Sequence, residues 1–372
     1  MNIGIMSMQR IINYGSFLQA WGLKSVLEQM GADVQFVDYT ICPPLPSTQS
    51  SSRRPCVAKR LFSLFRPSYR RQRRVDVKVN RIYSDFVRHF TEEYLPLLGI
   101  TEQKNYRPEL DLLVIGSDEV FHCTQAETNV GYSPELFGQN HRAKRLASYA
   151  ASFGSTTLDT IRYYSKEDEL RTLLKQFDDL SVRDANSRYL VQELCGTLPE
   201  QHIDPVLLYN FESEVPGSVP LRNYVLFYSY CGRFSREEAE AAREFAHSRG
   251  KKLISLGFWQ DCCDEYVSAT PFEVLAYFKY ADYVITDTFH GTVMSIKYNK
   301  RFVCLVRSSN KQKMQSLLRD FGLIGQIADS ACMFEEKLTG PIAYDIANDY
   351  LACQQLVSRA YLQQQIDEIS KH

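Results

Sequence analysis

Residues 3–39 read IGIMSMQRIINYGSFLQAWGLKSVLEQMGADVQFVDY. A short apolar segment at residues 2–7 predicts a buried strand, and a second strand is expected from Val34 to Tyr39. Between them, after Asn13-Tyr14-Gly15, apolar side chains recur at helical spacing until Gly31, which suits a helix C-terminus. A strand, a helix and a second strand within about 38 residues predict a parallel sheet.

The same alternation continues along the chain in two halves. Further strands are expected at residues 111–115, 145–149, 180–183, 224–230, 252–256, 283–286 and 302–306, with helices between them. Residues 211–222 contain two prolines and a glycine, which suits a linker. The chain has 372 residues, and a single core rarely grows past about 250–300 residues. We therefore expect an α/β protein with two Rossmann-like domains, residues 1–210 and 211–340, whose parallel sheets face a central cleft, and a C-terminal helix in 341–372 that packs back on the first domain.

Bulk composition narrows the functional classes. The formal net charge is −1, which gives no long-range field that favours nucleic acid. No apolar run reaches the ~18 residues of a membrane span, and the N-terminus lacks the layout of a signal peptide. Ten cysteines are present, but their spacing includes no CxxC pair and fits no metal site. Reduced thiols, a cytoplasmic location and the absence of a bound metal are expected.

An insertion at about residues 42–81 interrupts the alternation. It opens with the Pro/Ser-rich stretch CPPLPSTQSSS, and residues 53–81 then carry eleven cations against the single acid Asp76. We expect basic helices here, which either form a solvated or partly disordered surface or contact anionic lipid at the inner face of the membrane. Nucleic acid is not expected as a partner, because aromatic residues are sparse in the segment.

Ligands of open parallel sheets bind beyond the carboxyl ends of the strands. His290 is the sharpest candidate there, because it follows a predicted buried strand and precedes Gly291 and a helix. Histidine can transfer a proton near neutral pH, and a helix start offers N–H groups to a phosphate. The competing interpretation is a structural histidine that caps the strand end.

Three other strand ends carry candidate residues. Arg183 can hold a phosphate or carboxylate with two hydrogen bonds, or it can form a salt bridge with a neighbouring acid such as Asp184. The segments Gly116-Ser117-Asp118 and Asn13-Tyr14-Gly15 either bind a polar ligand or form capped helix starts. The chain contains no Walker lysine loop, no GxGxxG and no GxSxG, which argues against P-loop kinases, common nicotinamide enzymes and α/β-hydrolases.

Taken together, these segments resemble the polysaccharide pyruvyl transferase family. The matching stretches are IGIMSMQRIINYGSFLQAWGLKSVLEQMGADVQFVDY, DLLVIGSDEVF, SYAASFG, LSVRDANSRYLV, HIDPVLL and ADYVITDTFHGTVMSIKYNKRFVCL. They occur in the order of the family and span residue 3 to about residue 306. The resemblance implies a GT-B-like two-domain fold, phosphoenolpyruvate as co-substrate rather than a bound cofactor, and a sugar acceptor on a surface polysaccharide or its lipid-linked precursor. The implied product is a pyruvate ketal that bridges two hydroxyls of one sugar.

The resemblance also implies residue roles. His290 would be the catalytic acid or a phosphate ligand, and Arg183 would clamp the donor. Further donor or phosphate contacts are expected from Gly116, Ser117, Asp118, Thr288, Gly291 and Thr292. Residues expected to line the cleft or contact the acceptor are Asn13, Tyr14, Gly15, Phe121 and Tyr228.

One position departs from the pattern of some family members, which carry an arginine two residues before the histidine. This chain has Thr288 there, so a strongly anionic donor needs another cation, such as Arg307 or an arginine of the basic segment. Two other functions stay open: a GT-B-type glycosyltransferase that uses a nucleotide sugar, and a non-catalytic glycan-binding relative, because fold alone does not fix function.

Overall fold

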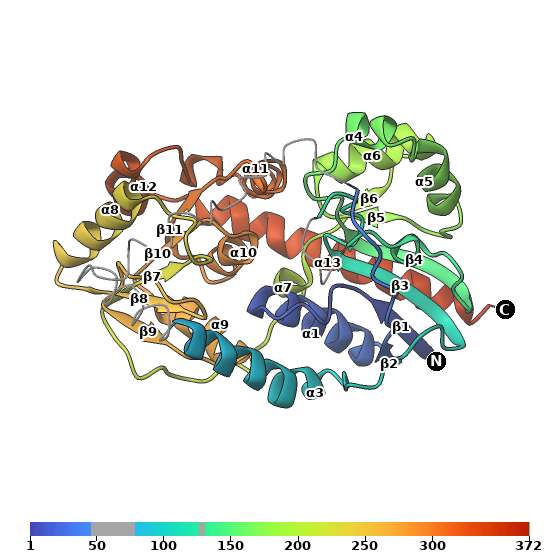
Figure 1. Cartoon of the computed structure of the whole chain (residues 1–372), viewed down its shortest axis with the longest axis horizontal. Coiled ribbons are helices and arrows are strands. Elements are labelled where there is room, and N and C mark those ends of the chain that lie inside the picture. The colour runs from blue at the N-terminus through green and yellow to red at the C-terminus, as the bar shows by residue number, and fades with distance from the viewer. Residues whose placement is uncertain (46–78, 126–130, 372) are drawn as a thin grey trace, which may run out of the picture.

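The chain folds around two six-stranded sheets whose paired strands are all parallel (Figure 1). The structure is a computed structural model that describes residues 1–45, 79–125 and 131–371. Each sheet carries helices on its faces, so the predicted α/β class with a GT-B-like pair of Rossmann-like domains is confirmed. Most of the basic insertion lies outside the described residues.

The first sheet has the strand order β2-β1-β3-β4-β5-β6. Its strands are β1 (Asn2–Met6), β2 (Asp33–Phe36), β3 (Leu110–Asp118), β4 (Ala143–Ala151), β5 (Ser181–Val182) and β6 (Glu200–Gln201). The helical segments of this half are α1 (Tyr14–Gln29), residues 79–89, η2 (Phe90–Tyr94), α3 (Leu95–Leu97), η3 (Pro134–Phe137), α4 (Leu158–Tyr163), α5 (Glu167–Leu174), α6 (Ala185–Cys195) and α7 (Pro205–Leu208).

The second sheet has the order β12-β11-β10-β7-β8-β9. Its strands are β7 (Tyr224–Tyr228), β8 (Lys252–Leu256), β9 (Glu265–Val267), β10 (Tyr283–Thr286), β11 (Arg301–Leu305) and β12 (Ile327–Ala328). The helices are α8 (Arg236–His247), α9 (Pro271–Tyr280), α10 (Phe289–Lys297), α11 (Lys311–Asp320), η4 (Ile324–Gln326), η5 (Ala331–Met333), α12 (Phe334–Thr339) and α13 (Tyr344–Ile369). The proposed domain limits near residues 210 and 340 fall outside all of these strands and helices.

Local sequence explains where the main elements begin and end. Asn13 caps α1 by accepting a hydrogen bond from the Ser16 N–H at 2.7 Å, and Gly31 follows the helix with φ +88°, a backbone conformation that favours glycine. The central strand β3 is apolar and almost wholly buried, as expected for a parallel strand that is covered on both faces. The strand–helix–strand interpretation of residues 3–39 is thus confirmed.

The two halves share one apolar core. The largest cluster of buried side chains contains Phe17 of α1 as well as Phe278 of α9, and Trp21 of α1 packs edge-on against Phe272 of α9, with ring centroids 5.0 Å apart. α13 runs from the second half back along the first sheet (Figure 1), where Tyr361 donates a hydrogen bond to the Ser148 carbonyl at 2.8 Å. The interface therefore contributes to the stability of both halves.

The nine cysteines of the described residues are all free thiols. No helix in residues 1–45, 79–125 or 131–371 combines the length and the apolar character that crossing a bilayer requires.

Candidate active site

The candidate site lies where the carboxyl ends of β3, β5 and β6 meet the start of α10. His290 occupies the first turn of α10, and Thr288 caps that helix by accepting a hydrogen bond from the Gly291 N–H at 3.0 Å. Thr286 fixes the preceding strand end by donating to the Tyr228 carbonyl at 2.7 Å. These contacts hold the His290 side chain at the face of the second domain that meets the first.

The β3 end directs Asp118 towards this interface. The peptide bond between Gly116 and Ser117 is cis, and Gly116 has φ +129°. A Cβ there would lie 2.1 Å from the Tyr149 carbonyl oxygen, so only glycine fits. The Ser117 hydroxyl accepts from the Asp118 N–H at 2.6 Å. The Asp118 carboxylate then faces Arg183 at 3.2 Å and Ser16 at 3.4 Å.

Arg183 is buried at the end of β5, with 3% of its side chain exposed. One Nη atom donates to Asp204 at 2.6 Å and the other to Asp118 at 3.2 Å. Its guanidinium carbon lies 4.1 Å from the centroid of the Phe289 ring, within cation–π range. Its buried Nε has no hydrogen-bond partner in the described part of the chain.

Asp204 connects Arg183 to His290 across the domain interface. Its Oδ2 atom accepts from Arg183 and lies 3.6 Å from His290 Nε2, too far for a hydrogen bond but close enough for charge pairing. Burial alone would raise the pKa of Asp204, but His290 and Arg183 lower it to about 2. Asp204 also caps α7, because its other oxygen accepts from the Val206 N–H at 3.0 Å. It is therefore held ionised and fixed in position.

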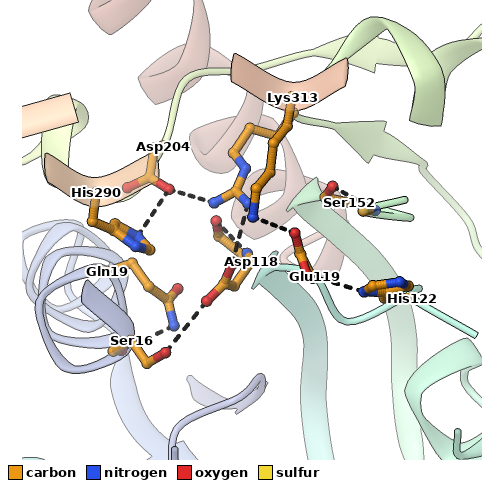
Figure 2. Close-up of polar contacts among 12 residues, drawn as sticks. Ser16, Gln19, Asp118, Glu119, His122, Ser152, Asp204, His290 and Lys313 are labelled. Atoms are coloured by element: carbon orange, nitrogen blue, oxygen red, sulfur yellow. Dashed lines mark hydrogen bonds and ion pairs between the residues drawn. The ribbon is translucent and has the colours of Figure 1, made fainter. Parts of the chain in front are cut away.

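A second ion-paired chain reaches the same place from α11. Lys313 pairs with Glu119 of the first domain, and Glu119 contacts His122 Nδ1 at 3.0 Å (Figure 2). Burial would raise the pKa of Glu119, but Lys313 and His122 hold it well below its usual range. The Lys313 ammonium lies 5.5 Å from the Phe289 ring centroid, the ring that also packs on Arg183. Two cations, one from each domain, are thus positioned around one aromatic ring.

Four of these residues line a small cleft between the domains, and His290 is not among them. Arg183 and Asp204 line it from the first domain, and Phe289 and Lys313 line it from the second. Residues of α13 complete the wall. The cleft is therefore bounded by two cations and by the carboxyl groups of Asp204 and Asp320.

Comparison with known proteins identifies the family of this chain. The model of a family described as polysaccharide pyruvyl transferase matches residues 13–309. The chain belongs to the polysaccharide pyruvyl transferase family. A search of curated protein sequences gave no match.

Solved structures with a similar course of the chain were also found. They include a Thermobaculum terrenum O-GlcNAc transferase mutant, with 13% identity and a TM-score of 0.43 over 99% of this chain and 66% of that one. S. aureus MnaA with UDP has 10% identity and a TM-score of 0.47 over 98% and 90% of the two chains. A Neisseria meningitidis UDP-GlcNAc 2-epimerase bound to UDP-GlcNAc has 8% identity and a TM-score of 0.45 over 99% and 98%. At such low identities and TM-scores, these similarities do not bear on activity.

Several residues that the family pattern highlights lie together. Asp204 joins His290 to Arg183, Arg183 pairs with Asp118, and Ser117 orients Asp118. Gly15 adjoins them as well, because a Cβ there would lie 2.2 Å from His290 Nδ1. The absence of a side chain at Gly15 lets α1 pack directly against the histidine.

Other predicted site residues have structural contacts instead. The Gly291 and Thr292 N–H groups donate to the Thr288 side chain and carbonyl, so they are not free to bind a phosphate. Phe121 lies in a core cluster of the first domain, stacked on Phe137 with centroids 4.8 Å apart, and not at the cleft. Its apolar neighbours after β3 draw it inward.

The remaining predicted residues hold elements in place near the site. Asn13 caps α1, and Tyr14 donates to the Ala269 carbonyl at 2.6 Å, which ties α1 to the second domain. Tyr228 is buried against Phe278 and beside Gly291. Arg307, the expected substitute cation, is bound by Glu238 and Asp287.

Residue patterns in the sequence did not single out Asp204, Glu119 or Lys313. Asp204 had a usable signal, because it stands before Pro205 where a helix follows a strand end. Lys313 had none, since it lies inside a helix of the other domain, and only the packing of the two domains brings it to the cleft.

Proposed function

We propose that this family member transfers the pyruvyl group of phosphoenolpyruvate to two hydroxyls of one sugar, in a surface polysaccharide or its lipid-linked precursor. The observation that carries the proposal is the sharing of Asp204 by Arg183 and His290, which come from different domains. A proton-transfer group and a carboxylate-binding group therefore stand side by side, and Arg183 and Lys313 line a common cleft.

The reaction accounts for these groups. A proton is added to the methylene carbon of phosphoenolpyruvate, which makes the central carbon electrophilic, and a sugar hydroxyl attacks that carbon. The bond to the bridging oxygen breaks and phosphate leaves. A second hydroxyl of the same sugar then closes the ketal. Of the two protons that the hydroxyls lose, one replaces the proton given to carbon and the other leaves with phosphate.

His290 is the proposed acid. Asp204 orients its ring and offsets the charge that the imidazole carries when it holds the proton. Arg183 is the proposed ligand of the donor carboxylate, because its Nε is an unused donor. Lys313 is the proposed phosphate ligand and supplies the cation that Thr288 does not, while Arg307 is engaged elsewhere.

Substitution of His290 by glutamine tests the proposal. We expect phosphate release from phosphoenolpyruvate in the presence of a cell-envelope glycan to fall by about 10²–10⁴-fold in kcat, the usual contribution of a general acid. The His247→Gln variant is the matched control, because His247 is a half-exposed histidine of α8 paired with Asp264. Its kcat should equal that of the wild-type protein.

Calorimetric titration separates the proposal from the alternatives. Binding of phosphoenolpyruvate by the wild-type protein, lost in Arg183→Ala and His290→Ala, supports it. Binding of a nucleoside diphosphate sugar in place of phosphoenolpyruvate would favour a glycosyltransferase. Binding of neither by a folded protein would favour a non-catalytic relative.

A further inference from the structure

Gln19 of α1 has a fully buried side chain whose orientation is fixed by two contacts. Its Nε2 donates to the Ser7 hydroxyl at 3.0 Å and to the Ser16 carbonyl at 3.1 Å. The Ser7 hydroxyl donates its own proton to the Ser117 carbonyl at 3.0 Å, so it can only accept a hydrogen bond from Gln19. Both partners therefore require the amide nitrogen, and the carbonyl oxygen must point the other way.

That carbonyl oxygen, Oε1, is buried and has no hydrogen-bond partner among the residues that the structure describes. A buried acceptor without a partner costs about 1–3 kcal/mol. Gln19 lies one helical turn after Gly15, whose backbone packs on His290, and so occupies the same face of α1. Figure 2 shows its amide between His290 and Asp118.

Two other unpartnered atoms belong to the same network. They are Arg183 Nε and His290 Nε2. Asp204 joins Arg183 to His290, and Asp118 joins Arg183 to Ser16 beside Gln19. Clustering of unpartnered buried polar atoms in one place marks a site that binds a polar ligand. This cluster offers a hydrogen-bond donor, Arg183 Nε, and a hydrogen-bond acceptor, Gln19 Oε1. It therefore suits ligands that between them both accept and donate hydrogen bonds.

Phosphoenolpyruvate can form a hydrogen bond with only one of these two atoms. Ionised carboxylate and phosphate groups accept hydrogen bonds and do not donate them, so the donor substrate pairs with Arg183 but not with a carbonyl oxygen. We propose that Gln19 binds the second substrate, and that its Oε1 accepts a hydrogen bond from a hydroxyl of the acceptor sugar. The inference rests on the proposed function and deepens it, because it places a sugar hydroxyl against α1 beside the proposed acid.

Gln19→Met tests this directly, because methionine has a similar shape and lacks the carbonyl. Initial rates of phosphate release are measured with methyl hexopyranosides that carry a free 4,6-diol. One series varies the glycoside at saturating phosphoenolpyruvate, and the other varies phosphoenolpyruvate at saturating glycoside. We expect the KM for the sugar to rise about 10-fold or more, the effect of losing one buried hydrogen bond. The KM for phosphoenolpyruvate should stay within about 2-fold.

Two control variants separate this role from a structural one. Ser7→Ala removes the fixed partner of Nε2 and leaves Oε1 in place, and Gln29→Met makes the same exchange at the exposed end of α1. Gln29→Met should keep the wild-type KM for the sugar, and Ser7→Ala, in which the Ser16 carbonyl still orients the amide, should raise it less than Gln19→Met does. The inference is overturned if the KM for the sugar is unchanged in Gln19→Met. It is also overturned if Gln19→Met and Ser7→Ala raise the KM values for both substrates equally.

Failure of the proposed function has a different signature. If the wild-type protein neither binds phosphoenolpyruvate nor releases phosphate from it, the proposed function is wrong. Titration of the same glycosides, followed by NMR, then decides the inference alone: weaker sugar binding by Gln19→Met supports it, and equal binding by both proteins overturns it.

Discussion

Two arginines sit at strand ends of this molecule, each over an aromatic ring and each between two carboxylates. Arg183 pairs with Asp118 and Asp204. Arg307 forms a bidentate pair with Glu238 at 2.9 Å for both bonds, and its Nε donates to Asp287 at 3.3 Å. Every side-chain nitrogen of Arg307 therefore has a partner, whereas the buried Nε of Arg183 has none among the described residues.

The buried acids of the two clusters respond differently to their surroundings. Burial favours the neutral form of both carboxyls. In Asp204 the nearby Arg183 and His290 outweigh burial and lower the pKa to about 2. In Asp287 burial prevails over Ser229, Arg233 and Arg307, and the pKa is raised. The Arg183 cluster keeps one guanidinium donor without a partner among the described residues, whereas the fully paired Arg307 holds its loops together.

The largest expected effect on ligand affinity comes from Arg183→Lys. Lysine keeps the charge but cannot hold two acids and present a third donor in one plane. We expect the Kd for phosphoenolpyruvate to rise about 100-fold, the loss of a charge-assisted pair of bonds. Calorimetric titration measures this change. If the affinity fell equally in Arg307→Lys, the contrast between the two arginines would be wrong.

An intermediate effect is expected on acid stability. The folded pKa of Asp204 lies below its ordinary value of 3.8, so its charge stabilises the fold above about pH 4 and this contribution is lost as pH falls towards 2. The loss amounts to about 2 kcal/mol. Asp287 has a raised pKa, so protonating it relieves a cost.

Urea unfolding of the wild type, Asp204→Asn and Asp287→Asn between about pH 7 and pH 2 tests this sign. The stability advantage of wild type over Asp204→Asn should shrink on acidification. The difference between wild type and Asp287→Asn should move the opposite way. If the stability differences of the two variants from wild type changed with pH in the same direction, the proposed electrostatic contrast between Asp204 and Asp287 would be wrong.

The smallest effect is expected from Arg307→Lys. Loss of the second bond to Glu238 should lower the free energy of unfolding by about 1 kcal/mol, while the Kd for phosphoenolpyruvate stays within about 2-fold of wild type. Thermal unfolding and calorimetry give the two numbers. A marked loss of donor affinity would show that Arg307 reaches the ligand after all.

Most strands and helices could be predicted because the spacing of apolar residues in the sequence follows the period of each element. Apolar runs such as residues 111–115, each followed by glycine or a capping residue, mark parallel strands and their carboxyl ends. Strands of two residues, such as β5 and β6, leave almost no periodic signal, yet β5 was found from Arg183 and its apolar neighbours. β6, β9 and β12 were missed, because short edge strands pair through backbone contacts that composition does not encode.

The candidate site was predictable only where a strand end carried it. His290, Arg183 and Asp118 follow strands, so topology brings their ends to one edge of each sheet. Lys313 lies in the first turn of α11, and its place at the site depends on how the two domains dock. Phe121 shows the converse error, because a residue three positions after Asp118 can turn into the core.

The path of α13 bears on how the chain is made. Its Tyr361 and Ser358 contact Ser148 and His202 of the first domain, although the whole second domain lies between them in sequence. Domains usually fold as units in order of synthesis. Here the first domain lacks part of its outer layer until the ribosome has translated about 150 further residues beyond the linker, so early intermediates expose the apolar surface that α13 later covers.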